Sequence, residues 1–226
     1  MPIVVPTIST KDWKRQLRGH DKPWRDGFRI KSLADHWQGA VGFPVDVQQM
    51  FKSAGITGIK DAEMLLSVPE YETELLAKGG PSFADLFVLA TSSDGLITMM
   101  VESRVDEPFD SIFNSLLWKK GDVIDKRTTL TGLSEILGIT VGDASVVRYQ
   151  LLHRTASALI EAERYSATTT VMLVHSFSSE GMWFEDYEAF GAALGVSVES
   201  GQLVDAGIRS GRRLMLGWLT SPILSI

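Results

Sequence analysis

The sequence predicts an α/β protein with a mixed central sheet flanked by helices, and three of its features support that class. Two apolar runs, 85–90 and 96–101, surround a turn at 92–95, which is typical of a β-hairpin. The segment 146–165 carries apolar side chains at helical spacing. The short apolar run 170–175 that follows is typical of a buried strand. Helices and strands in this order indicate a mixed sheet.

The composition is that of an ordinary globular chain. Of the 226 residues, 44% are hydrophobic and 22% are charged, and no apolar run approaches the ~20 residues that cross a bilayer. The N-terminus lacks the basic and long apolar stretches of a secretory signal. The absence of cysteine excludes disulfides, thiolate metal sites and cysteine nucleophiles. We therefore expect a cytoplasmic protein that does not contact membranes.

The charge is uneven along the chain. The net charge is −6, but the segment 11–31 holds eight basic and three acidic side chains and is therefore +5. Such asymmetry can steer a polyanion to one face of a protein. A solvated helical face explains the same pattern and is the simpler interpretation.

The first part of the chain is predicted to be a small helical module. Capping residues and helical spacing predict three helices, which begin near Lys11, Ile30 and Pro44. A short edge strand or extended arm is expected before them, at 2–8. We divide the chain into an N-terminal strand and helical module at 1–58 and an α/β core domain at 59–226.

The core domain is predicted to contain further elements around the hairpin. Asp61 can cap a helix that carries Glu63. The remaining expected elements are a loop at 78–82, helical segments at 111–137 and 183–194, and a last strand at 214–219.

Three charged side chains gather at the open end of the predicted hairpin. If Asp94-Gly95 forms the turn, Asp85 lies opposite Arg104. If the loop is the four residues 92–95, Asp85 lies opposite Glu102. Side chains alternate between the two faces of a strand, so both registers place Asp85, Glu102 and Arg104 on one face.

Two facing carboxylates at this position can hold a divalent cation. Opposed Cβ atoms lie ~4.5–5.5 Å apart, and carboxylates at that separation repel each other unless a positive group neutralises them. Mg²⁺ prefers one or two carboxylates together with water and phosphate oxygens. A nearby cation such as Arg104 can then stabilise the charge that develops during phosphoryl chemistry.

The same residues resemble the PD-(D/E)XK nuclease superfamily. Its members place an Asp before a strand and a Glu-x-Lys at the end of the paired strand, as Asp85 and Glu102-Ser103-Arg104 do here. The segment Gln150-Leu151-Leu152-His153-Arg154 resembles the Gln-x-x-x-Tyr helix motif of the exonuclease branch. The resemblance covers roughly residues 60–176 and implies a restriction-endonuclease-like fold. The whole chain also resembles a bacterial protein family of unknown function.

The resemblance implies a Mg²⁺-dependent nuclease, a hydrolase of phosphodiesters with nucleic acid as its partner. Carried over to this chain, Asp85 and Glu102 are metal ligands, and Glu63 is a third acidic ligand. Arg104 completes the catalytic set, at the position where the family has a lysine that orients or activates water. The side chains expected to line the substrate side are Gln150 and Arg154.

Two departures from the family pattern indicate degenerate catalysis, which is altered, weakened or absent, and they also favour a different function on the same fold. Asp85 follows Phe83-Ala84 rather than proline, and an arginine such as Arg104 stays protonated and cannot act as a base. The alternative is a non-catalytic interaction or regulatory protein, with a homo-oligomer as one of its forms.

The four histidines indicate no zinc protease. None of them forms a His-Glu-x-x-His pair. His153 lies on the helix expected at 146–165, and His175 ends the strand expected at 170–175. We interpret both as hydrogen-bonded core residues.

Overall fold

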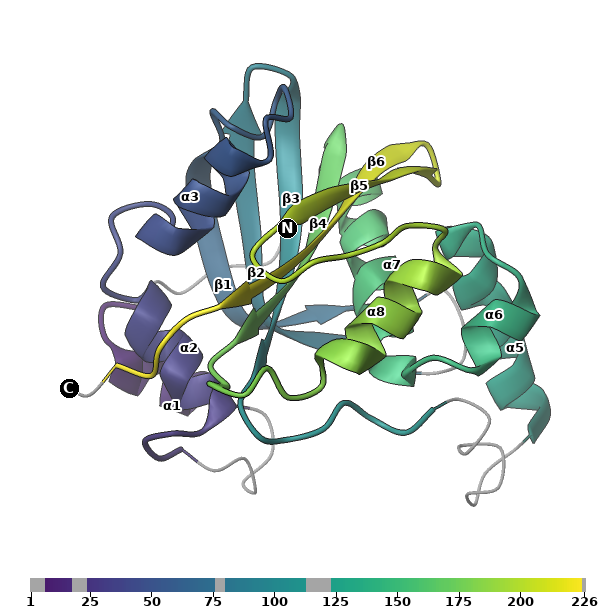
Figure 1. The fold of residues 1–226 in the computed structure, drawn as a ribbon, viewed down its shortest axis with the longest axis horizontal. Helices are drawn as coiled ribbons and strands as arrows, with labels where there is room; N and C mark the ends of the chain where they lie inside the picture. Colours follow the sequence, from purple (N-terminus) through teal and green to yellow (C-terminus); the bar gives the residue numbers. More distant parts are fainter. Residues whose placement is uncertain (1–6, 18–23, 76–79, 113–122, 225–226) are drawn as a thin grey trace.

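The computed structural model describes residues 7–17, 24–75, 80–112 and 123–224, which form a six-stranded sheet with helices on both faces (Figure 1). The described helices and strands are, in chain order, α1 (Thr10–Gln16), α2 (Arg29–Trp37), α3 (Val45–Ser53), β1 (Glu63–Thr73), β2 (Ser82–Ser92), β3 (Gly95–Arg104), α5 (Val123–Leu137), α6 (Val141–Ser145), α7 (Tyr149–Arg164), β4 (Thr169–Ser176), α8 (Phe184–Ala193), β5 (Leu203–Arg209) and β6 (Arg212–Thr220). This is the mixed α/β sheet that the sequence predicts.

The sheet has a parallel centre between antiparallel edges. Its strand order is β1-β2-β3-β4-β6-β5. The pairs β1–β2, β2–β3 and β5–β6 are antiparallel, whereas β3–β4 and β4–β6 are parallel. Because a parallel pair needs a long crossover, the chain between β3 and β4 passes through α7, which packs on both strands.

Alternation along the strands gives the sheet two buried faces. Phe87 and Leu89 of β2 belong to a core that includes residues of α5, α7 and α8. Leu86 and Val88 of the same strand belong to a second core, which includes residues of α1, α2 and α3. Strands that are buried on both faces are nearly continuous apolar runs, which is why the hairpin is conspicuous in the sequence.

The hairpin register brings Asp85 and Glu102 opposite each other. The ladder closes on the turn at 92–95, and Leu86 pairs with Val101, so Asp85 and Glu102 occupy the next position along the two strands. Of the two registers that the sequence leaves open, this is the one predicted for the 92–95 loop.

The three N-terminal helices form where the sequence predicts them. At the start of α1, the carboxylate of Asp12 accepts the backbone N–H of Ser9 at 3.0 Å. Trp13, Leu33 and Phe51, one from each helix, are buried in the core that includes the sheet. The N-terminal helices therefore form a layer on the sheet and share its apolar core.

The structure corrects the helix predicted from Asp61. Residues 63–66 begin the edge strand β1, because pairing with β2 outweighs the helix propensity of Glu63 and its apolar neighbours. Pro69 is tolerated in β1 because an edge strand leaves one side of its ladder unpaired.

Besides β1, the strand β5 and the short helix α6 were not predicted from the sequence. Parts of the expected segments at 2–8, 78–82 and 111–137 lie outside the described residues. No helix in the described part of the chain combines the length and the apolar character that a membrane crossing requires.

Candidate functional site

Asp85 and Glu102 meet at the open end of the hairpin. Asp85 lies near the start of β2 and Glu102 near the end of β3, so antiparallel pairing brings them together. The Oδ2 atom of Asp85 accepts hydrogen bonds from the backbone N–H of Ser103 at 2.9 Å and from its hydroxyl at 2.7 Å. Both acidic residues are at most 1% exposed, so each carboxylate depends on donors inside the protein.

The guanidinium of Arg29 lies between these two carboxylates. Its Nη1 atom is 2.9 and 2.7 Å from the two carboxylate oxygens of Asp85 and 3.1 Å from Oε1 of Glu102. Arg29 is the first residue of α2, which packs on the face of the sheet opposite α7. Its side chain reaches the two carboxylates at the ends of the strands. Burial opposes its charge, but the charges of Asp85 and Glu102 raise the pKa of Arg29. A positive nitrogen thus occupies the position where the sequence predicts Mg²⁺.

Glu102 has every carboxylate oxygen in use. Its Oε1 atom also accepts hydrogen bonds from Nη1 of Arg104 at 3.1 Å and from Nε2 of Gln150 at 2.7 Å. Its Oε2 atom accepts Nε–H of Arg154 at 2.6 Å. Burial by itself would raise the pKa of Glu102, but the three neighbouring guanidiniums outweigh burial and lower that pKa to about 2. Glu102 is therefore an ionised carboxylate in the protein interior.

The side chain of Arg104 is enclosed by protein. It donates from Nη1 to the backbone carbonyl of Ser103 and from Nη2 to Oε1 of Gln150, both at 2.6 Å. Its Cζ atom lies 4.1 Å from the centroid of the Phe109 ring, which is a cation–π distance. Gln150 in turn accepts the backbone N–H of Asp110 at 3.2 Å. Arg104 thus acts as a structural cation that fixes the end of β3 against α7.

Arg154 connects the site to a neutral histidine. Its Nη1 atom donates to the Ser82 hydroxyl at 2.6 Å, and that hydroxyl lies 3.0 Å from Nδ1 of His153. Burial, aided by the charge of Arg154, lowers the pKa of His153 well below its ordinary value. His153 is therefore a hydrogen-bonded core histidine, as the sequence predicts.

The structure brings together five of the six residues that the sequence singles out. With Arg29 they form the arginine-carboxylate cluster, defined here as Arg29, Asp85, Glu102, Arg104, Gln150 and Arg154. Gln150 and Arg154 each donate one hydrogen bond to Glu102, and their role toward a substrate stays a prediction.

Glu63 is not part of this cluster. It opens β1 and pairs with Thr91, beside the hairpin turn, whereas the cluster lies at the other end of the hairpin. Pro69, which pairs beside Asp85, lies six positions further along the strand, and at ~3.4 Å per residue the separation is ~20 Å. The expectation of a third ligand at Glu63 fails because the predicted helix is a strand.

Two residues of the site were missed in the sequence. Arg29 belongs to the basic segment 11–31, but spacing alone gives no reason to place it against residues 56 and 73 positions away. Glu107 follows β3, and its charge also acts on Arg29. The Oε2 atom of Glu107 is buried and has no hydrogen-bond partner among the described residues. A third carboxylate therefore lies within electrostatic reach of the guanidinium that separates the first two.

The fold and site define an α/β protein with a mixed sheet and a buried cluster of arginines and carboxylates at one end of its central hairpin. The chain belongs to the family described as a domain of unknown function (DUF6946), which it matches over residues 6–223. No curated protein and no solved structure matches it significantly.

Proposed function

We propose that this protein has a restriction-endonuclease-like core and that it works as a non-catalytic interaction or regulatory protein. The observation that carries the proposal is the position of Arg29, whose single Nη1 atom contacts both Asp85 and Glu102. In the nucleases that the chain resembles, a divalent cation is held by the acids at these positions.

The order and direction of the elements support the proposed fold. Three antiparallel strands, β1 to β3, are followed by α7 and then by β4, which is parallel to β3. Asp85 lies on the second of these strands, Glu102 on the third, and Gln150 and Arg154 on the helix. The superfamily resemblance places its acids and its helix motif at the same points.

The cluster is poorly suited to hydrolysis in the described arrangement. A metal ion would have to displace donors that are already in place, because every oxygen of Asp85 and Glu102 accepts a hydrogen bond from a guanidinium, amide or hydroxyl group. Arg104 cannot serve as a base. The buried acids are also out of reach of a phosphodiester, because a scissile phosphate must touch the metal and the attacking water.

Mg²⁺-dependent phosphodiester hydrolysis is the second candidate function, and one observation favours it. The two carboxylates converge, and Arg29, with 21% of its side chain exposed, is the most accessible of the three guanidiniums around them. If Arg29 withdraws with its helix, Asp85 and Glu102 are left as two carboxylates, which Mg²⁺ can bind together with water.

Cleavage assays separate the two functions. The purified chain is incubated with Mg²⁺ or Mn²⁺ and with single-stranded DNA, double-stranded DNA or RNA, and Mg²⁺ binding is measured by calorimetry. The non-catalytic proposal expects intact substrates and no Mg²⁺ binding. Cleavage that disappears in Asp85→Asn but persists in Asp205→Asn, a carboxylate of the surface pair with Arg213, would establish hydrolysis instead.

A further inference from the structure

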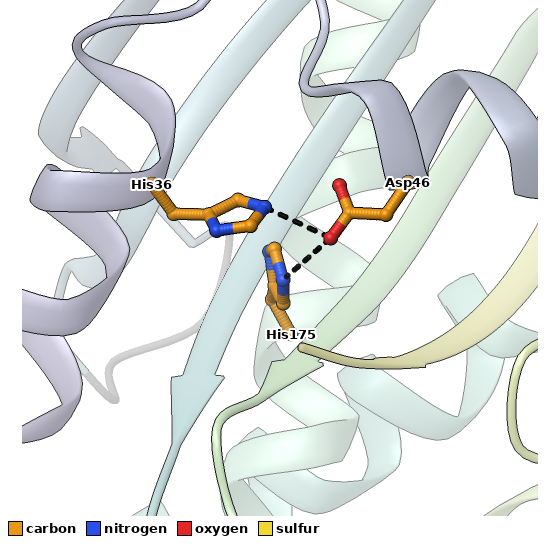
Figure 2. A group of neighbouring side chains, drawn as sticks. All are labelled: His36, Asp46 and His175. Atoms are coloured by element: carbon orange, nitrogen blue, oxygen red, sulfur yellow. Dashed lines mark ion pairs between the residues drawn. The ribbon is translucent and has the colours of Figure 1, made fainter. Parts of the chain in front are cut away.

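A second polar cluster lies on the opposite face of the sheet and joins three elements (Figure 2). His36 comes from α2, Asp46 from the first turn of α3 and His175 from the end of β4. Nε2 of His36 lies 2.8 Å from Oδ2 of Asp46, and Nε2 of His175 lies 4.0 Å from the same oxygen. One ligand atom from each residue lies within 4.8 Å of the other two. We call these residues, with Ser221, the histidine-aspartate cluster.

The hydrogen bonds of this cluster fix the protons of His175. Nε1–H of Trp37 points at Nδ1 of His175 over 3.0 Å. An indole nitrogen only donates, so Nδ1 accepts and the proton of the neutral imidazole is on Nε2. That Nε2–H donates to the Ser221 hydroxyl at 2.8 Å, and Ser221 donates to Asp46. Burial, aided by the charge of His36, lowers the pKa of His175 to about 3, so the imidazole is neutral at ordinary pH.

We propose that His36, Asp46 and His175 bind a divalent transition-metal ion of the Zn²⁺ class. Two imidazole nitrogens and one carboxylate oxygen form the three-ligand set of many open zinc sites, with water in the fourth position. Tetrahedral ligands at ~2.0–2.1 Å from zinc lie ~3.3 Å from one another. The 4.0 Å between Asp46 and His175 therefore has to shorten by only a fraction of an ångström.

The cluster offers a route for entry and a ligand that can adjust. The side chain of Asp46 is 30% exposed, whereas His175 is fully buried, so an ion arrives from the Asp46 side. Asp46 starts a helix, and its Oδ1 accepts the backbone N–H of Val47 at 2.9 Å, whereas its Oδ2 contacts, among the described residues, only the side chains of His36, His175 and Ser221, which belong to the cluster itself. The Ser221 hydroxyl, which bridges His175 and Asp46 without metal, is displaced when the ion takes both of its partners.

The hydrogen bond from Trp37 to His175 competes with metal binding, which gives the proposal a specific test. A neutral histidine that binds metal through Nε2 carries its proton on Nδ1. In His175 that proton would face the indole N–H of Trp37, so the bond between them must break. His36 meets no such conflict, because its Nδ1 has no hydrogen-bond partner among the described residues. Metal binding is therefore coupled to the contact that α2 makes through Trp37.

Metal titration of the untagged, chelator-treated chain tests the ligand set. We expect one Zn²⁺ or Co²⁺ per chain by calorimetry, with a Co²⁺ absorption spectrum of nitrogen and oxygen ligands. Asp46→Asn and His36→Gln should each weaken binding at least tenfold, and His153→Gln, a buried histidine outside the cluster, should leave it unchanged. Circular dichroism checks folding, and Asp46→Asn, at the exposed ligand, carries the test if His36→Gln does not fold.

The tautomer of His175 and the Trp37→Phe variant test the coupling. Long-range ¹⁵N spectra of the imidazoles should show the His175 proton on Nε2 without metal and on Nδ1 with Zn²⁺. Trp37→Phe removes the opposing donor and should tighten Zn²⁺ binding several-fold. The proposal is overturned if binding does not saturate, if Asp46→Asn and His36→Gln bind like the unmodified chain, or if Trp37→Phe weakens binding.

Discussion

The two polar clusters occupy the same end of the sheet but satisfy their charges in different ways. Ser103, which binds Asp85, is the register partner of His175 across β3 and β4. In the arginine-carboxylate cluster, charged guanidiniums neutralise two buried carboxylates, and Ser103 and Gln150 donate further hydrogen bonds to them. In the histidine-aspartate cluster, one partly exposed carboxylate collects hydrogen bonds from imidazole and hydroxyl groups. The carboxylates of the first cluster are buried and already paired with cations, whereas the carboxylate of the second is accessible to an ion from solvent.

Helix α2 supplies both clusters. Arg29 and His36 are seven residues apart, which is two helical turns, so their side chains point to the same side of the helix. The helix therefore contributes the cation Arg29 to the arginine-carboxylate cluster and the proposed metal ligand His36 to the histidine-aspartate cluster. A movement of α2 would open the first cluster and disassemble the second, which links the two proposals physically.

The largest effect is expected from Glu102→Gln. Removing this charge leaves three guanidiniums around an amide, and breaking a buried ion pair from one side costs about 3–5 kcal/mol. Urea denaturation should show this loss of unfolding free energy. Asp205→Asn, which breaks a surface pair with Arg213, should cost less than about 1 kcal/mol. Equal effects of the two variants would contradict the difference between a closed cluster and a surface pair.

The acid sensitivity of folding should depend on the same carboxylate. The pKa of Glu102 is lowered from 4.5 to about 2 in the folded chain, so the unfolded chain binds the proton more tightly. Its stabilising contribution is complete above pH 4.5 and is lost as the pH falls toward 2, and it is on the order of 3 kcal/mol. Denaturation midpoints measured from pH 6 to 2.5 should fall less steeply in Glu102→Gln. An unchanged slope would show that other groups govern the acid response.

Removing Arg29 from the arginine-carboxylate cluster should create a Mg²⁺ site, and the free energy that Mg²⁺ adds to stability should be smaller than the two effects above. Arg29→Met removes the nitrogen between Asp85 and Glu102, and Mg²⁺ can then neutralise the two acids. At ten times its Kd, Mg²⁺ would stabilise the variant by about 1.4 kcal/mol relative to the metal-free form. Thermal denaturation with and without Mg²⁺ measures this, with Arg213→Met as the matched arginine control. If Mg²⁺ does not raise the denaturation temperature of Arg29→Met, Arg29 does not occupy a cation site.

The sequence predicts the first cluster better than the second for a physical reason. Strand alternation and hairpin pairing are local rules, and they were enough to place Asp85, Glu102 and Arg104 on one face. Arg29 joins them across 56 residues or more, and no local period encodes such a contact. Likewise, His175 was predicted as a core histidine, but its neighbours His36 and Asp46 come from helices whose packing on the sheet the sequence does not specify.

The expected helix at Glu63 shows the converse limit. Glu, Met and Leu are good helix formers, yet the segment is a strand because β2 offers an edge to pair with. The third acidic ligand was assigned on that helix, so one error in secondary structure moved a predicted site residue to the wrong end of the hairpin.

The smallest expected effect comes from Ser221→Ala and bears on the second cluster alone. Without metal, the hydroxyl relays a hydrogen bond from His175 to Asp46, and its loss should cost about 1 kcal/mol. With Zn²⁺ bound, the ion takes both partners, so the variant should bind Zn²⁺ more tightly by about the same free energy. Urea denaturation with and without Zn²⁺ measures both the loss of stability and the gain in Zn²⁺ binding. The arginine-carboxylate cluster should not respond, because Ser221 makes its hydrogen bonds to His175 and Asp46. A stability loss that persists undiminished in Zn²⁺ would mean that the hydroxyl and the metal do not compete, and that the cluster is a fixed hydrogen-bond relay.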